Sequence, residues 1–210
     1  MHVICAMMEV LKKKKPEEYV DGLLHFFAAP VVNGLRCACL INLKRGNSSG
    51  DKDITNAWFC RKHELLKKYA LQAHELTGRN EAGEEFLLLL IYKYKALQQA
   101  LFNKKSSRIL AKFGYQTRPL SLESHLLKLE NRFSGKFPHE IGLFLGFPPE
   151  DVWGYIKNDG NNAMASGYWK VYGNVRRAKS EFAKIKEAES NAARRILKQS
   201  GWQPGLSMPF

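Results

Sequence analysis

The segment with the most unusual local composition is KFPHEIGLFLGFPP at Lys136–Pro149, in which His139 and Glu140 precede an apolar run. A histidine beside a carboxylate can perform general acid–base chemistry, because imidazole titrates near neutral pH. The backbone N–H groups at a helix N-terminus also favour an anion. A simpler interpretation stays open, since proline followed two residues later by glutamate is also typical of a well-capped helix start. We take His139 and Glu140 as candidate catalytic residues.

A second candidate is the aromatic segment YWKVY at Tyr168–Tyr172. In a strand, Lys170 lies with the two tyrosines on one face and Trp169 lies on the other. This pattern indicates either a ligand-binding face with a cationic anchor or a solvated face with Trp169 in the core. The same two alternatives hold for YKYK after the apolar run at 86–91. The candidate ligand-binding residues are therefore Arg36, Tyr92, Lys93, Trp169 and Lys170.

The chain has four cysteines and no C-x-x-C pair. Cys37, Cys39, Cys60 and His63 can supply four ligands in the pattern C-x-C…C-x-x-H, which suits zinc. We favour the alternative that Cys37 and Cys39 are small apolar residues of a buried strand, because free cysteine is among the most buried residue types. We therefore predict no metal site, and the residues indicate no particular cofactor.

Several function classes lack their signatures in this sequence. A phosphate-binding P-loop, a dinucleotide-binding G-x-G-x-x-G and a G-x-S-x-G nucleophile elbow are absent. Helix-turn-helix, zinc-finger, RNA-recognition and KH signatures are absent as well. The net charge of +13 nevertheless attracts polyanions. Non-specific nucleic-acid binding through Lys12–Lys15 and the basic helix 175–199 is therefore an alternative function.

The candidate residues are positioned by a pattern of short strands and more numerous helices. Alternation predicts a strand at 35–43, an apolar run predicts one at 85–95, and aromatic content predicts one at 168–172. Helices are expected at 16–29, 57–76, 96–101, 107–113, from 121 onward, 138–145, 149–156 and 175–199, with a turn at 77–83, a loop at 45–53 and a frayed tail at 203–210. The expected fold class is α+β, with a small mixed sheet of about three strands covered by seven to eight helices in a single domain.

Within that domain we separate a basic N-terminal segment at 1–15, a main α+β region at 16–182, and a basic helix end and tail at 183–210. The N-terminal apolar stretch precedes the lysines, which reverses the order of a signal peptide. The apolar run Phe86–Ile91 is far shorter than the ~20 residues of a membrane span. We expect a soluble cytoplasmic protein without a membrane span.

These segments resemble a bacterial family catalogued as domain of unknown function 3793, common in anaerobic Firmicutes. The resemblance rests on FPHEIGLFLGFPPEDVWGYI at Phe137–Ile156 and SGYWKVYGN at Ser166–Asn174, with weaker support at His25–Leu43 and Leu87–Leu97. It covers about Tyr19 to Phe182 and implies that His139, Glu140, Trp169 and Lys170 are family features. It brings no activity with it. Relatives differ at Arg36–Cys39 and carry cysteine where this chain has Ser166, which argues against a shared metal site or thiol chemistry.

The leading hypothesis is a domain that binds a small molecule or an anion near Pro138-His139-Glu140, with enzymatic activity left open. Arg36, Lys93 and Lys170 stand near strand ends, where loops place functional groups on a rigid scaffold. The alternative partner is nucleic acid or another polyanion, bound by the basic segments.

Overall fold

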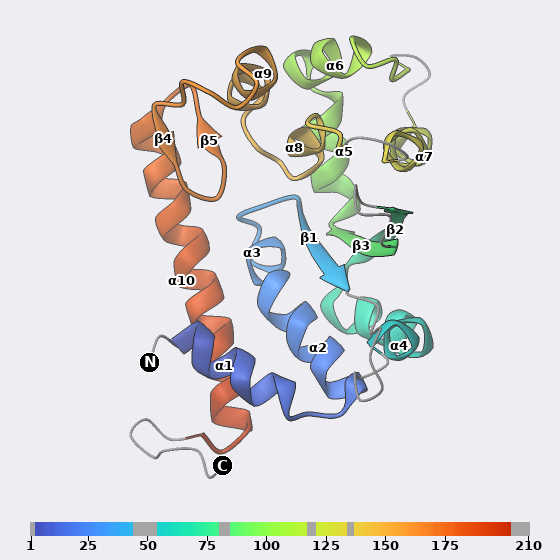
Figure 1. Ribbon diagram of the computed structural model, residues 1–210, viewed down its shortest axis with the longest axis vertical. Helices are drawn as coiled ribbons and strands as arrows, with labels where there is room; N and C mark the ends of the chain where they lie inside the picture. Colours follow the sequence, from blue (N-terminus) through green and yellow to red (C-terminus); the bar gives the residue numbers. More distant parts are fainter. Residues whose placement is uncertain (1–2, 44–53, 80–84, 117–120, 134–136, 203–210) are drawn as a thin grey trace.

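The computed structural model describes residues 3–43, 54–79, 85–116, 121–133 and 137–202 (Figure 1). The helices in these ranges are α1 (Val3–Lys12), α2 (Pro16–Phe27), α3 (Ala29–Val32), α4 (Ile54–Tyr69), α5 (Tyr94–Phe102), α6 (Lys104–Ala111), α7 (Leu122–Arg132), α8 (Ile141–Phe144), α9 (Pro149–Lys157) and α10 (Val175–Gln199). The strands are β1 (Ala38–Leu43), β2 (Gln72–Arg79), β3 (Glu85–Tyr92), β4 (Ala165–Ser166) and β5 (Lys170–Val171). The expected α+β class with a small three-stranded sheet is confirmed.

The sheet has the order β1-β3-β2, and both pairings are antiparallel. The central strand β3 alternates between two hydrophobic clusters. Leu87, Leu89 and Ile91 face one cluster, whereas the even-numbered residues Leu88 and Leu90 face the other. A strand buried on both faces has an almost continuous apolar sequence, which explains the run in EFLLLLIY.

Helices cover both faces of this sheet and make three layers (Figure 1). The first cluster joins the sheet to α1, α2, α3, α4 and the C-terminal half of α10. The second joins the other face to α5, α6, α7, α8 and α9. A third, smaller cluster packs the β4–β5 hairpin on the N-terminal half of α10, through Trp169, Val171, Ala178 and Ile185.

Among the described residues, no helix combines the length and apolar content that a bilayer crossing needs.

The third strand of the sheet differs from the sequence-based expectation. Gln72–Arg79 forms edge strand β2, where we expected the end of a helix and a turn, and the strand expected at 168–172 forms a separate hairpin. The sheet is antiparallel throughout, not mixed. The helix α4 ends at Tyr69, and the positive φ of 51° at Ala70 turns the chain. The residues Ala73, Glu75 and Leu76 favour a helix locally, but pairing with β3 overrides that preference.

Local signals correctly predicted the other long elements. The helix from Pro16 ends before Pro30, and the long basic helix spans Val175–Gln199 as expected. The basic N-terminal segment contains a helix that we did not predict, α1, which crosses α10 and joins the first cluster (Figure 1). The expected loop at 45–53 and tail at 203–210 lie outside the described residues.

Candidate functional site

An open-sided pocket of about 340 Å³ lies between segment 137–147, α9 and the β4–β5 hairpin. Its lining residues are Phe137, His139, Ile141, Gly142, Leu145, Phe147, Asp151, Val152, Tyr155, Ser166, Gly167, Trp169 and Lys170. Three residues proposed from the sequence, His139, Trp169 and Lys170, therefore line one concave surface. They come from two segments that are separated by α9 in the chain.

The turn after α8 brings segment 137–147 to the pocket. Gly146 has a φ of 75°, which favours glycine, and a side chain there would place Cβ 2.8 Å from the Cys37 sulfur. The tight turn against Cys37, next to β1, therefore favours glycine at this position. Pro149 then occupies the first turn of α9, where its fixed φ suits a helix start.

Stacked aromatic rings form one wall of the pocket. The rings of Phe147 and Trp169 are stacked with centroids 5.1 Å apart and planes at 28°. Phe182 of α10 meets the Trp169 ring edge-on at 4.5 Å. Such contacts on both sides hold Trp169 in one orientation, so the wall is preformed.

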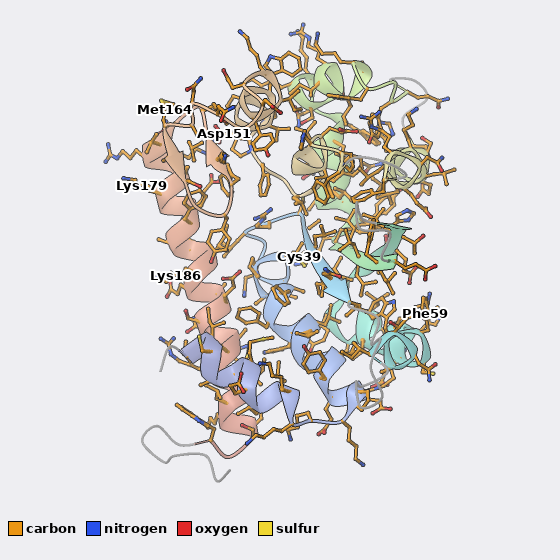
Figure 2. All side chains as sticks on the ribbon, viewed as in Figure 1. Cys39, Phe59, Asp151, Met164, Lys179 and Lys186 are labelled. Carbon is orange, nitrogen blue, oxygen red and sulfur yellow. The ribbon has the colours of Figure 1, made fainter. Side chains whose placement is uncertain are left out.

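The hairpin is attached to α9 by the carboxylate of Asp151, a side chain only 3% exposed (Figure 2). Its Oδ2 accepts from the Trp169 indole N–H at 2.8 Å. Its Oδ1 accepts from the backbone N–H groups of Tyr172 and Gly173, both at 2.7 Å. A buried carboxylate with three donors is well compensated for the loss of water. Asp151 therefore fixes the hairpin and the indole of Trp169.

Besides Asp151 and Ser166, the polar side chains that line the pocket are those of His139, Tyr155 and Lys170. The His139 and Tyr155 rings lie 5.1 Å apart, and the Lys170 ammonium lies 5.8 Å from the centre of the Tyr155 ring. Lys170 donates one hydrogen bond to the carbonyl oxygen of Gly160 at 2.6 Å. An ammonium has three N–H groups, so two more can serve a ligand. A cation and an imidazole beside aromatic walls suit an organic ligand with an anionic group.

The family model described as protein of unknown function (DUF3793) matches residues 24–203. The chain belongs to this family. The resemblance found on the His139 and Trp169 segments is thereby confirmed, and every residue that lines the pocket of this DUF3793 chain lies within the matched range. No curated protein and no solved structure matches the chain.

Glu140, proposed together with His139, points away from the pocket of the DUF3793 chain. Its side chain is 1% exposed and forms an ion pair with Arg132 from α7. The hydroxyl of Tyr115 also donates to Glu140, at 3.2 Å. Burial, together with this carboxylate, raises the pKa of Tyr115 far above its usual range. Glu140 thus joins α7, the segment after α6 and the start of α8, while His139 faces the solvent-open pocket.

Arg36 lies behind the aromatic wall. Its Nε and Nη2 donate to the carbonyl oxygen of Leu145 at 3.1 and 2.6 Å, and its guanidinium carbon lies 4.5 Å from the centre of the Phe147 ring. Burial lowers the pKa of Arg36, although an arginine stays charged. Arg36 is not among the described residues that line the pocket, so it meets the site through the rings of Phe147 and Trp169.

Tyr92 and Lys93, at the end of β3, lie apart from this pocket. Tyr92 is buried in the second cluster, and burial raises its pKa. The Lys93 ammonium donates to the carbonyl oxygen of Val32 at 2.8 Å, and the Lys93 backbone N–H bonds the oxygen of Cys37. Both residues therefore connect the sheet to neighbouring elements.

Cys37 lies just before β1 and Cys39 lies within it, and both are in surroundings that suit apolar residues. Cys37 is buried, and its thiol donates to the carbonyl oxygen of Phe144 at 3.4 Å. Burial raises the pKa of Cys37 to about 11 and that of Cys39 to about 12, so both thiols are protonated at neutral pH. The described residues contain no group of three or more histidine, cysteine or acidic side chains arranged to hold a metal ion.

The basic charges are spread over several surfaces. Lys12 pairs with Glu9 at 2.7 Å and Lys14 lies 3.7 Å from Glu18, so part of the basic N-terminal run is matched by acids. On α10, Lys179 and Lys186 project from the outer side of the helix (Figure 2).

Sequence reasoning missed Asp151, Tyr155 and Phe147 as parts of the site. One signal was available, because Asp151 and Tyr155 are four residues apart and therefore share a helix face. Their partner, the hairpin, lies 10 to 20 residues further along the chain and is placed by tertiary packing alone.

Proposed function

We propose that this DUF3793 protein binds a small organic anion in the pocket between α9 and the β4–β5 hairpin. The observation that carries the proposal is the convergence of His139 and Lys170 beside the stacked Phe147 and Trp169 rings. At about 340 Å³ the pocket is at the small end of the roughly 300–1,000 Å³ typical of ligand sites.

The ligand that fits best has an apolar or aromatic body and one anionic group. Phe137, Phe147 and Trp169 supply apolar and aromatic lining for the body. Lys170 supplies a positive charge at the rim, and His139 supplies a ring nitrogen for a hydrogen bond. Because Asp151 has all its hydrogen bonds inside the protein, it takes no part in ligand binding.

Two fluorescent probes of matched shape test this function. The sulfonate 8-anilinonaphthalene-1-sulfonate and the neutral N-phenyl-1-naphthylamine share the same rings and differ in charge. We expect the sulfonate to bind more tightly, because Lys170 lies at the rim. Lys170→Met should raise its dissociation constant about fivefold, as expected for one exposed charged hydrogen bond, and leave the neutral probe unchanged.

Lys179→Met is the matched control, since Lys179 is an exposed lysine on α10 outside the pocket. The proposal is contradicted if both lysine variants weaken the sulfonate equally. A dissociation constant that rises steeply with salt in the wild type would instead indicate general polyanion attraction, as the nucleic-acid alternative predicts.

A further inference from the structure

A second open-sided pocket of about 300 Å³ lies between α2–α3 and the middle of α10. No described residue lines both this pocket and the pocket at α9. The three helices lie side by side in Figure 1, and pack together within the first hydrophobic cluster. The pocket is therefore a separate feature of the fold.

Two cations of α10 line this second pocket. Lys184 and Arg195 are eleven residues apart, which is close to three helical turns, so they share one side of the helix. Neither forms an ion pair with another described residue. Glu187 is the one carboxylate among the described lining residues, so the two cations leave a net positive charge among their lysine, arginine and acidic side chains.

A hydrogen-bonded chain of side chains ends at the inner part of this pocket. The Lys68 ammonium donates to Asp21 at 2.8 Å, and the Tyr69 hydroxyl donates to the same carboxylate at 2.9 Å. Tyr69 has only one hydroxyl proton, so the contact between its oxygen and His25 Nδ1 at 3.3 Å requires the proton on Nδ1. The other ring nitrogen of His25, Nε2, has no hydrogen-bond partner among the described residues.

Burial acts against the protonation of His25 in the empty pocket, and the charges around the ring act in both directions. Burial lowers its pKa, Asp21 opposes this, and the positive charges of Lys68 and Arg195 lower the pKa further. Tyr69, Lys184 and Glu187 are the other titratable groups that line the pocket. An anion beside Nε2 would reverse the balance, because it favours the charged imidazolium.

We propose that this pocket binds the phosphate group of a small phosphate ester. Arg195 contacts the phosphate oxygens, and His25 takes up a proton on Nε2 to donate a second hydrogen bond, while Lys184, about 16 Å further along α10, adds to the positive charge of the pocket. Phosphate presents three oxygens and a charge near −2, which suits a guanidinium and an added imidazolium. Val32 and Leu35, both 40% exposed at the pocket, offer an apolar surface to the organic part of the ester.

The test titrates the whole protein with inorganic phosphate and with phenyl phosphate by calorimetry, at constant ionic strength. We expect saturable binding of both and tighter binding of phenyl phosphate. Arg195→Met should weaken phosphate about tenfold, the loss expected for one charged hydrogen bond. Arg176→Met is the matched control, because Arg176 is exposed on the same helix outside the pocket, and it should leave the dissociation constant unchanged.

A second readout is the pKa of His25, followed by the NMR signal of its ring. Phosphate should raise this pKa in the wild type. In Arg195→Met the pKa of the free protein should already be higher, because a nearby positive charge is gone, and phosphate should raise it less. Equal losses in Arg195→Met and Arg176→Met would overturn the proposal. So would the absence of saturable binding, or a His25 pKa that phosphate leaves unchanged.

Discussion

Replacing Asp151 by alanine will lower the free energy of unfolding by about 3 kcal/mol, because it leaves three hydrogen-bond donors without their acceptor. The indole N–H of Trp169 is buried and cannot reach water easily. The backbone N–H groups of Tyr172 and Gly173 are partly buried and lose less. Urea unfolding followed by circular dichroism measures the change.

The neighbouring residue provides the control for this prediction. Glu150 is exposed and only 3.8 Å from an exposed Lys105, so Glu150→Ala should change the free energy of unfolding by less than about 0.5 kcal/mol. The Asp151 variant should also bind the naphthalene sulfonate more weakly, since the hairpin forms one wall of the pocket. If Asp151→Ala is as stable as Glu150→Ala, the carboxylate does not hold the hairpin.

The two candidate catalytic residues should respond in opposite ways to replacement by alanine. Glu140→Ala removes a buried carboxylate from Arg132 and from the Tyr115 hydroxyl, and should cost about 3 kcal/mol of stability. His139 is exposed, so His139→Ala should cost less than about 0.5 kcal/mol. In probe binding the order reverses: His139→Ala should weaken the sulfonate, while folded Glu140→Ala should bind it as the wild type does.

This pair of variants distinguishes two interpretations of the Pro138-His139-Glu140 motif, a ligand-binding role and a structural role at the helix start. If His139→Ala binds the sulfonate normally, the histidine belongs to the helix start and not to the site. If Glu140→Ala stays fully stable and loses probe binding, the carboxylate acts on the ligand in spite of its burial. Binding must be measured below the unfolding temperature of the weaker variant, with folding checked by circular dichroism.

The sequence predicted the elements whose signals are local. Pro16 followed by acidic residues starts α2, and Asn174 caps α10 by accepting from the backbone N–H of Arg177 at 2.9 Å. The apolar run of β3 required burial on both faces. By contrast, β2 is an edge strand in which Ala73, Glu75 and Leu76 favour a helix, and its pairing with β3, from Gln72 opposite Tyr92 to Arg79 opposite Glu85, makes it a strand.

The sequence predicted only part of the candidate site, because residue type marks polar and aromatic side chains but tertiary packing decides which of them meet. Residue type singled out His139, Trp169 and Lys170, and tertiary packing brings all three to one pocket. Residue type also singled out Glu140 and Arg36, whose polar groups are instead turned inward to Arg132 and to the Leu145 carbonyl. A sequence pattern does not distinguish a polar side chain that faces a ligand from one that joins two helices.

The most direct test follows the tryptophan indole N–H signals by NMR while the naphthalene sulfonate is added. The chain has four tryptophans, so four signals are expected. We predict that the Trp169 signal shifts and saturates with the dissociation constant found by fluorescence. The Trp58 signal should stay fixed, because that side chain is 0% exposed in the first cluster. A Trp169 signal that does not move at saturation would contradict the assignment of the ligand site to this pocket.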